Sequence, residues 1–411
     1  MPTKSISTSS ISSASDDDFD LTKFIDRGMC TGFDHVTFYV GSVNAAAREL
    51  INSFGFISRY ELGLETGSKS ICSKVVCNGN VRIQLMGTVR PLHSTPDDPR
   101  VDEIHLHIAT HGDGVKDIAF SVTNVEKFCE RAEKAGGTLL MRPQTIKDKN
   151  GEIILARIAG IGDTVHTIID RTNYNGFLPG PYNVTDSATD RQGEDFPTLN
   201  MTCIDHVVQN DDWNMMLKDC KFYKKVFGFH KFWSVDERQI HTKYSALKST
   251  VMASENESVK MPVNEPAKGL KTSQIEEYME FNAAAGIQHV AIKVPDILSA
   301  VSEMKKHGVQ FINVPDSYYE NLKKRMEASK HPKFEESFER IKKLGILIDY
   351  DENGYLLQLF TKPVFDRPTF FFEVIQRHNH NGFGAGNFKG LFEVLEADQA
   401  KRGNLNTSTR I

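Results

Sequence analysis

Residues 32–56 read GFDHVTFYVGSVNAAARELINSFGF, and residues 203–229 read CIDHVVQNDDWNMMLKDCKFYKKVFGF. Both stretches begin with an Asp-His step in a run of alternating apolar residues, continue with a helical pattern and end at an aromatic-Gly-Phe turn. The histidines, His35 and His206, are 171 residues apart. Alternation with a period of two is typical of a strand, and a glycine-bearing turn often ends a helix. Each stretch therefore predicts a strand followed by a helix.

A second pair of similar stretches lies at nearly the same separation. GVKDIAFSVTNVEKFCERAEKAGG begins at Gly114 and GIQHVAIKVPDILSAVSEMKKHGV begins at Gly286, an offset of 172 residues. Two landmarks at a nearly constant offset indicate a tandem duplication. Strand-like stretches such as Val81–Met86 and Tyr355–Phe360 follow the helices. We therefore predict an α+β fold of tandem β-α-β-β-β modules with curved, mixed sheets, not a doubly wound parallel sheet.

The composition divides the chain around this repeat. We predict a disordered Ser/Asp-rich tail at 1–28, an N-terminal domain at 29–172, a Gly/Pro/Asn/Asp-rich linker at 173–197, a C-terminal domain at 198–401 and a flexible tail at 402–411. A glycine-bearing loop over 382–390 leads into a predicted C-terminal helix, Phe388–Ala400, which could act as a lid.

Charge and cysteine content exclude several classes of function. The 411 residues include 49 Lys+Arg and 54 Asp+Glu, so the net charge of -5 does not supply the basic surface that binds nucleic acid. No apolar run approaches the roughly 18 residues that indicate a membrane span. The six cysteines are scattered without a CxxC motif, and the N-terminus has no apolar stretch typical of secretion. We expect a cytoplasmic protein that binds neither nucleic acid nor membrane.

Three residues of the second half carry a chemical signal. His206 and His289 lie at matching points of successive modules, and Glu373 lies in the apolar, strand-like run PTFFFEVIQR. They are 83 and 84 residues apart, so each can come from an equivalent strand and project into one shared cup. Two imidazoles and one carboxylate suit ferrous iron and leave positions open for other ligands. A metal ion would also explain a carboxylate in an apolar run.

Each of these residues alone has a simpler interpretation, as a core or surface side chain, and only their matched positions favour a metal site. The first half supplies a control, because His35 matches His206 whereas Asp117 and Thr167 stand where His289 and Glu373 do. We expect that half to bind no metal and to act as a scaffold.

Five further histidines give weaker signals. His105 and His107 could face one way on a strand, with His111 nearby, but no carboxylate or thiolate partner accompanies them. His378 and His380 follow the glutamate strand in a polar loop and are expected to be solvated.

The duplicated Asp-His modules resemble the vicinal-oxygen-chelate (glyoxalase-like) superfamily, whose β-α-β-β-β units pair into open barrels around a metal. The second half is similar to the 4-hydroxyphenylpyruvate dioxygenase family in IDHVVQN (204–210), LKSTVMAS (247–254), MPVNEP (261–266), SQIEEYMEFNAAAGIQHVA (273–291), LGILIDYDENGYLLQLFTKP (344–363), DRPTFFFEVIQR (366–377) and GFGAGNF (382–388). The resemblance covers essentially residues 32–401.

This resemblance implies one Fe(II) per chain on His206, His289 and Glu373, in agreement with the reading from spacing. It also implies a set of substrate contacts, with Phe360 and Phe388 on either side of the substrate ring and Phe371 on the strand face of the glutamate. The implied substrate contacts are Ser249, Asn264, Gln274, Gln288, Gln358, Phe360, Phe371, Asn387 and Phe388.

The implied reaction converts 4-hydroxyphenylpyruvate and O2 to homogentisate and CO2 in tyrosine and phenylalanine catabolism, by a homodimer. Two alternatives remain open. A 4-hydroxymandelate synthase shares the fold, the iron and the substrate but hydroxylates the benzylic carbon, and its relatives have an aliphatic residue where Phe360 stands here. A metal-free binding or regulatory protein could also keep the fold, although the intact triad argues against it.

Overall fold

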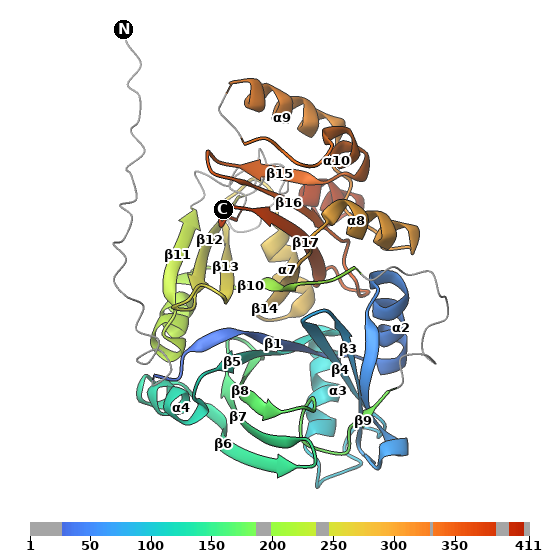
Figure 1. The fold of residues 1–411 in the computed structure, drawn as a ribbon, viewed down its shortest axis with the longest axis vertical. Coiled ribbons are helices and arrows are strands. Elements are labelled where there is room, and N and C mark those ends of the chain that lie inside the picture. The colour runs from blue at the N-terminus through green and yellow to red at the C-terminus, as the bar shows by residue number, and fades with distance from the viewer. Residues whose placement is uncertain (1–26, 186–198, 236–245, 329–331, 384–393, 407–411) are drawn as a thin grey trace.

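The computed structural model describes residues 27–185, 199–235, 246–328, 332–383 and 394–406, and these form two curved sheets, one above the other in Figure 1. The first half of the chain forms the lower sheet and the second half the upper one. No helix of the described residues is long and apolar enough to cross a membrane.

The first half forms a sheet with the order β6-β7-β8-β5-β1-β4-β3-β2-β9. Its strands are β1 (Cys30–Tyr39), β2 (Ile57–Leu62), β3 (Ile71–Asn78), β4 (Val81–Thr88), β5 (Gly114–Val122), β6 (Leu139–Asp148), β7 (Gly151–Ala159), β8 (Val165–Tyr174) and β9 (Asn183–Val184).

The second half forms a sheet with the order β11-β12-β13-β10-β14-β17-β16-β15. Its strands are β10 (Cys203–Asn210), β11 (His230–Val235), β12 (Ala246–Ala253), β13 (Lys260–Ala267), β14 (Gly286–Lys293), β15 (Leu347–Tyr350), β16 (Tyr355–Phe360) and β17 (Phe371–His378).

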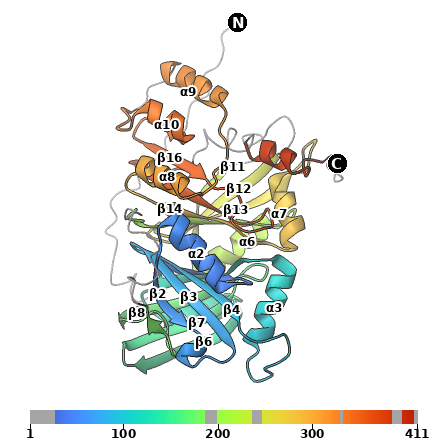
Figure 2. The same cartoon turned by 90° about the vertical axis from the view of Figure 1, so that its right-hand side faces the viewer.

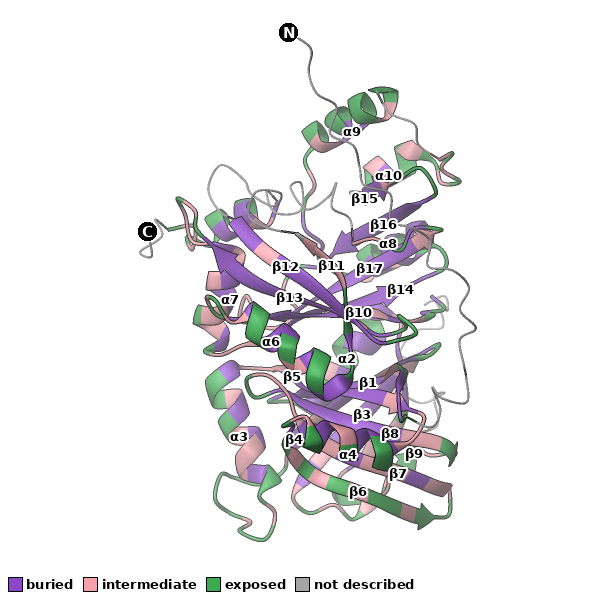
Figure 3. Ribbon diagram, turned by 90° about the vertical axis from the view of Figure 1, so that its left-hand side faces the viewer, coloured by how far each residue is buried: buried purple, intermediate pink, exposed green. Residues whose placement is uncertain are grey.

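Helices pack against both sheets, some of them where the two halves meet (Figure 2), and most helices have one exposed face (Figure 3). They are α2 (Val43–Phe54), α3 (Arg100–His111), α4 (Val125–Lys134), α6 (Met216–Phe222), α7 (Gln274–Asn282), α8 (Ile297–Lys306), α9 (Asp316–Ala328) and α10 (Phe338–Leu344), with a short 3-10 turn at Leu64–Thr66, a π turn at Tyr223–Phe227 and a helical segment at 394–401.

The strand pairing confirms the tandem modules. β1 lies between a parallel β4 and an antiparallel β5, and β10 lies in the same way between β13 and β14. β5 pairs in parallel with β8, as β14 does with β17. The first helical stretch of each half also ends as predicted, since Gly55 and Gly228 adopt φ values of 72° and 74°, in the left-handed region that favours glycine.

The Asp-His step carries the same irregularity in both halves. The register of β1 against β5 shifts between Phe33 and His35, and that of β10 against β14 shifts between Ile204 and His206. A bulge inserts one extra residue into a strand and re-aims the side chains beside it. Here the extra residue is the aspartate, which brings its carboxylate to the neighbouring imidazole.

One hydrophobic core runs through both halves. Phe38 of β1 packs edge-to-face on Phe370 at 4.8 Å between ring centroids and also contacts Phe372 at 6.4 Å. Phe120 and Phe128 of the first half pack on Phe227 of the second, each at 5.6 Å. Close-packed aromatic rings of this kind contribute strongly to a core, so the halves are joined as one body.

The predicted domain limits fall as follows in the structure. The predicted linker, 173–197, includes the end of β8 and the short β9, which pairs with β2, and residues 186–197 lie outside the described residues. Most of both tails, 1–26 and 407–411, and residues 388–393 of the predicted lid helix also lie outside them.

Two expectations about histidines are wrong. His105 and His107 belong to the helix α3, not to a strand, because Val101, Ile104, His107 and His111 form a buried stripe at helical spacing. His380 is buried and not solvated, and His378 ends β17 with its Nε2 2.9 Å from a carboxylate oxygen of Glu336.

Candidate metal centre and substrate cup

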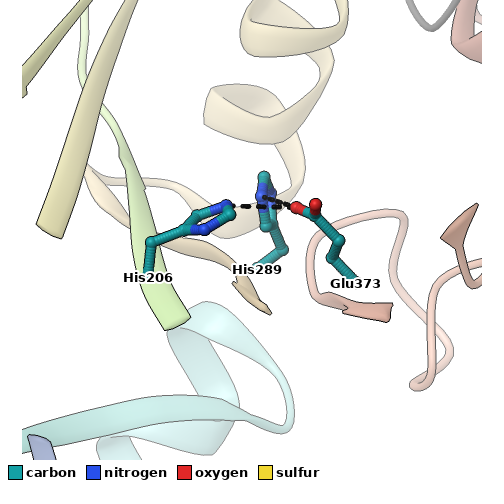
Figure 4. A group of neighbouring side chains, drawn as sticks. All are labelled: His206, His289 and Glu373. Carbon is teal, nitrogen blue, oxygen red and sulfur yellow. Dashed lines mark ion pairs between the residues drawn. The ribbon is translucent and has the colours of Figure 1, made fainter. Parts of the chain in front are cut away.

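Three adjacent strands bring His206, His289 and Glu373 together, as the spacing predicted (Figure 4). β14 pairs with both β10 and β17, so the three side chains point to one place from neighbouring backbones. The Oε2 atom of Glu373 lies 3.1 Å from Nε2 of His206 and 3.3 Å from Nε2 of His289. All three residues are buried.

These atoms fit a metal ion. Ligand atoms about 2.1 Å from a metal and at right angles to one another lie about 3.0 Å apart, which matches the two measured separations. Oε1 of Glu373 is buried and has no hydrogen-bond partner among the described residues, which is costly for a carboxylate that serves structure alone. Two histidines and one carboxylate on one face form the donor set typical of non-haem iron.

The local electrostatics also favour a cation at this point. Burial acts to raise the pKa of Glu373, but the charge of His206 and hydrogen bonds with both imidazoles outweigh it and lower the pKa to about 2. Burial lowers the pKa of His289, whereas the charges of Glu373 and Asp205 outweigh burial at His206 and raise its pKa. The carboxylate is therefore ionised and attracts positive charge.

Neighbouring side chains hold the two imidazoles. Nδ1 of His206 lies 2.7 Å from a carboxylate oxygen of Asp205, and Nδ1 of His289 lies 3.0 Å from the amide oxygen of Gln288. Phe371 stacks on the ring of His289 at 4.8 Å. Such contacts leave Nε2 of each ring free to bind a metal.

The triad lines a small cup of about 50 Å³. Its other lining residues are Val208, Trp233, Ser249, Val251, Pro262, Asn264, Gln358, Phe360, Ile375, Arg377 and Phe383.

The structure brings part of the predicted substrate set to this cup. Ser249, Asn264, Gln358 and Phe360 line it. The predicted Gln288 and Phe371 instead contact His289, and Gln274 is the first residue of α7 and is not part of the lining. Asn387 and Phe388 lie outside the described residues.

Several residues that line the cup were not predicted from the sequence. Val208 and Ile375 follow His206 and Glu373 by two positions, so strand alternation could have found them. Arg377 lies on the same strand, two positions after Ile375, so the same alternation could have found it. Trp233 and Phe383 come from other segments, and no local pattern marked them.

The first half holds a different cluster at the matching positions. Thr167 Oγ1 donates a hydrogen bond of 2.6 Å to Asp117, and Nε of Arg157 lies 3.7 Å from the same carboxylate. Arg157 pairs with Thr167 as Phe360 pairs with Glu373. A guanidinium thus lies beside the carboxylate at these positions, and in the described part of the chain His206, His289 and Glu373 are the one group arranged to hold a metal.

Comparison with known proteins agrees with this geometry. The model of the Glyoxalase/Bleomycin resistance protein/Dioxygenase superfamily matches residues 32–166 and 204–359. The chain is 51% identical to the 4-hydroxyphenylpyruvate dioxygenase of Yarrowia lipolytica, over 91% of this chain and 93% of that protein. The chain belongs to the 4-hydroxyphenylpyruvate dioxygenase family.

Other members of the family are similar over the same length. The 4-hydroxyphenylpyruvate dioxygenase of Aspergillus fumigatus is 50% identical over 91% of this chain and 94% of its own. That of Dictyostelium discoideum is 46% identical over 91% and 100%. Among solved structures, a mutant 4-hydroxymandelate synthase from Streptomyces coelicolor matches with a TM-score of 0.75 and 26% identity, over 90% of this chain and 99% of that one.

Proposed function

We propose that this chain is an Fe(II)-dependent enzyme that converts 4-hydroxyphenylpyruvate and O2 to homogentisate and CO2 in tyrosine and phenylalanine catabolism. The observation that carries the proposal is the buried His206–His289–Glu373 group, with one carboxylate oxygen that lacks a partner among the described residues. Membership of a family whose curated relatives are named for this reaction supports the choice of substrate.

One ferrous ion per chain fits this group. When bound, it supplies coordination positions for the keto acid and O2 and the redox chemistry that O2 activation needs. The ligand set brings a single negative charge, on Glu373, so the bound 2+ ion keeps a net positive charge that attracts the substrate carboxylate.

The polar wall of the cup suits the rest of the substrate. Ser249, Asn264 and Gln358 carry a hydroxyl and two amides, which can donate or accept hydrogen bonds without a fixed charge. We assign them to the phenol and keto-acid oxygens, with Gln274, Gln288 and Asn387 as the further polar contacts of the set. We also assign Phe360 and Phe388 to the aromatic ring of the substrate, with Phe371 behind His289.

The apolar wall excludes water. Val208, Val251, Pro262 and Ile375 line the same cup as the triad. A dry site protects reactive species from solvent and strengthens the electrostatic contacts that orient the substrate. The substrate supplies both the keto acid that is decarboxylated and the ring that is hydroxylated, so the reaction needs no second organic acid.

The second candidate is 4-hydroxymandelate synthase activity, which uses the same substrate. Phe360 contacts His289 edge-to-face at 5.8 Å and so lies directly beside the metal site. A large aromatic ring at this point favours attack on the substrate ring over attack on its side chain. The identity of about 50% with 4-hydroxyphenylpyruvate dioxygenases, against 26% with the synthase structure, also favours the dioxygenase.

A product assay tests the proposal. Purified chain is loaded with Fe(II) and given 4-hydroxyphenylpyruvate and O2, and the aromatic product is identified by chromatography and mass spectrometry. Homogentisate supports the proposal, and 4-hydroxymandelate would support the synthase. An iron-loaded, folded chain that consumes neither O2 nor substrate would support a binding protein instead.

We also propose that the protein acts in the cytoplasm as a homodimer. The six free cysteines support a reducing compartment. Light scattering coupled to size exclusion measures the mass directly, and a single species near 46 kDa would contradict the dimer, because one chain has a mass of 46.2 kDa.

A further inference from the structure

One ion pair lies directly behind the first metal ligand. Asp205 occupies the bulge of β10, and its Oδ1 atom lies 2.7 Å from Nδ1 of His206. Arg377 donates two hydrogen bonds to the same carboxylate, from Nε at 2.8 Å and from Nη2 at 2.7 Å. Both charged side chains are more than nine-tenths buried. A planar guanidinium that meets a carboxylate through two bonds holds it in one orientation.

The same arginine reaches the wall of the cup. Its third nitrogen, Nη1, donates to the backbone oxygens of His380 at 3.0 Å and Gly382 at 2.6 Å. Its guanidinium lies over the ring of Phe383 at 5.6 Å. That ring packs edge-to-face on His206 at 5.1 Å. Arg377 therefore touches, through one rigid group, the aspartate behind a ligand and the segment that covers that ligand.

The first half repeats the arrangement without a metal group. Arg171 donates two hydrogen bonds of 2.6 Å to Asp34, whose Oδ1 lies 2.6 Å from Nδ1 of His35. It also donates to the backbone oxygens of Gly176 and Phe177, and Phe177 packs on His35 at 4.9 Å. The network thus closes the turn after β8 in the first half and after β17 in the second. In the second half it lies against a metal ligand, and the first half provides a matched control.

The two charges of the pair have opposite effects on a bound cation. Together Asp205 and Arg377 are neutral. Without the carboxylate, a buried guanidinium remains near the metal and repels it, and His206 loses the partner that holds its Nδ1. Without the guanidinium, the carboxylate remains behind His206 and still favours a cation.

We propose that Asp205 and Arg377 are positioning residues of this site: Asp205 orients His206 toward the metal, and Arg377 holds Phe383 in place as the wall of the cup. The proposal rests on the proposed iron-dependent function and adds two residues outside its ligand and substrate set. One ion pair is then responsible for two separable properties of the site: its affinity for the metal and the closure of the cup by Phe383.

Metal affinity tests the first property without turnover. Fe(II) dissociation constants are measured anaerobically by competition with a colorimetric chelator for Asp205→Asn and Arg377→Met, with Asp34→Asn and Arg171→Met as matched controls. We expect Asp205→Asn to bind Fe(II) about 10- to 100-fold more weakly. Arg377→Met and both controls should stay within about threefold of the parent chain. Equal weakening by Asp205→Asn and Arg377→Met, or no weakening by Asp205→Asn, overturns the assignment of Asp205.

Tryptophan fluorescence tests the second property. The chain has two tryptophans, and Trp233 stacks on Phe383 at 6.2 Å. In a Trp213→Phe background, acrylamide should quench Trp233 at least twofold more strongly after Arg377→Met, and not after Arg171→Met. Homogentisate formed per O2 consumed should fall in the same variant. Unchanged quenching overturns the assignment of Arg377.

A conservative variant guards against loss of folding. Arg377→Lys keeps the positive charge but not the forked geometry, so it should restore the circular dichroism of the parent while Trp233 stays more quenchable. A failure of the proposed reaction would leave Fe(II) affinity and Trp233 quenching measurable, because neither of these two readouts uses the organic substrate. The proposed reaction and the positioning roles of Asp205 and Arg377 can therefore be refuted independently.

Discussion

His107 on α3 offers a quantitative test of the burial of charge in the first half. The residue is 7% exposed, and neither ring nitrogen has a hydrogen-bond partner among the described residues. The ring packs against Tyr39 at 5.3 Å and His111 at 4.8 Å. Burial, with smaller effects of the charges of His111 and Lys116, lowers the pKa of His107 to about 3 from 6.5. The folded protein therefore keeps this imidazole neutral.

The size of the effect follows from linkage. Because the pKa of this histidine is lower in the folded state, the free energy of unfolding depends on pH. The contribution of the neutral ring to that free energy is complete above the unfolded pKa, near 6.5, and is lost as the pH falls toward 3. The loss is about 1.4 kcal/mol for each pH unit within that window. Between pH 7.5 and 5.0, protonation of this one residue in the unfolded chain removes about 2 kcal/mol from the free energy of unfolding.

The perturbation is His107→Leu, which keeps a similar volume and removes the ionisable group. Because no described hydrogen bond is lost, we expect the variant to unfold at pH 7.5 with at least the free energy of the parent. At pH 5.0 it should be more stable than the parent by about 2 kcal/mol beyond any difference at pH 7.5.

Urea unfolding followed by circular dichroism measures both values, in the same metal state for all proteins. His105→Gln is the matched control, because His105 lies half-buried on the same helix, with hydrogen bonds to Thr88 and to the backbone oxygen of Arg90. If the free energies of unfolding of His107→Leu and the parent change equally between pH 7.5 and 5.0, the reasoning is refuted.

Four further predictions concern the site. Glu373→Gln should abolish turnover and lower Fe(II) affinity by at least 100-fold, since it removes the single anionic ligand; normal metal content by elemental analysis would contradict the triad. The parent chain should titrate with one Fe(II), and two equivalent tight sites would show that the first half also binds metal. Phe360→Ile should shift part of the product from homogentisate to 4-hydroxymandelate, which mass spectrometry would detect; a product mixture identical to that of the parent counts against the role of this ring. Truncation after Arg377 leaves all three ligands in the chain but should lower homogentisate formed per O2 consumed, and a ratio that stays near one would mean that the C-terminal segment is only structural.

Some of this architecture is visible in local sequence patterns. The tandem modules appear as two pairs of similar stretches, because each repeat encodes its own strand, helix and glycine turn within about 30 residues. The triad is visible for the same reason, since equivalent strands of a duplicated motif place their side chains at nearly even spacing. The difference of the first half is also visible in the sequence, where Asp117 and Thr167 stand at the positions that match His289 and Glu373.

Other features arise only when distant residues meet. Asp205 and Arg377 are 172 residues apart, and their contact depends on a one-residue bulge that alternation alone does not reveal. Arg157, which lies beside Asp117 in the first half, is an ordinary strand residue in the sequence pattern.

The sequence by itself determined the duplicated fold and the grouping of His206, His289 and Glu373, since both follow from periodic patterns within a strand or a helix. The tertiary structure decided which side chains contact these three residues and which line the cup. Hydrogen bonds and ring contacts between separate segments depend on sheet register and on burial, and these are properties of the packed chain. Charged groups such as Arg377 are stable in the interior only because the fold brings a partner to them.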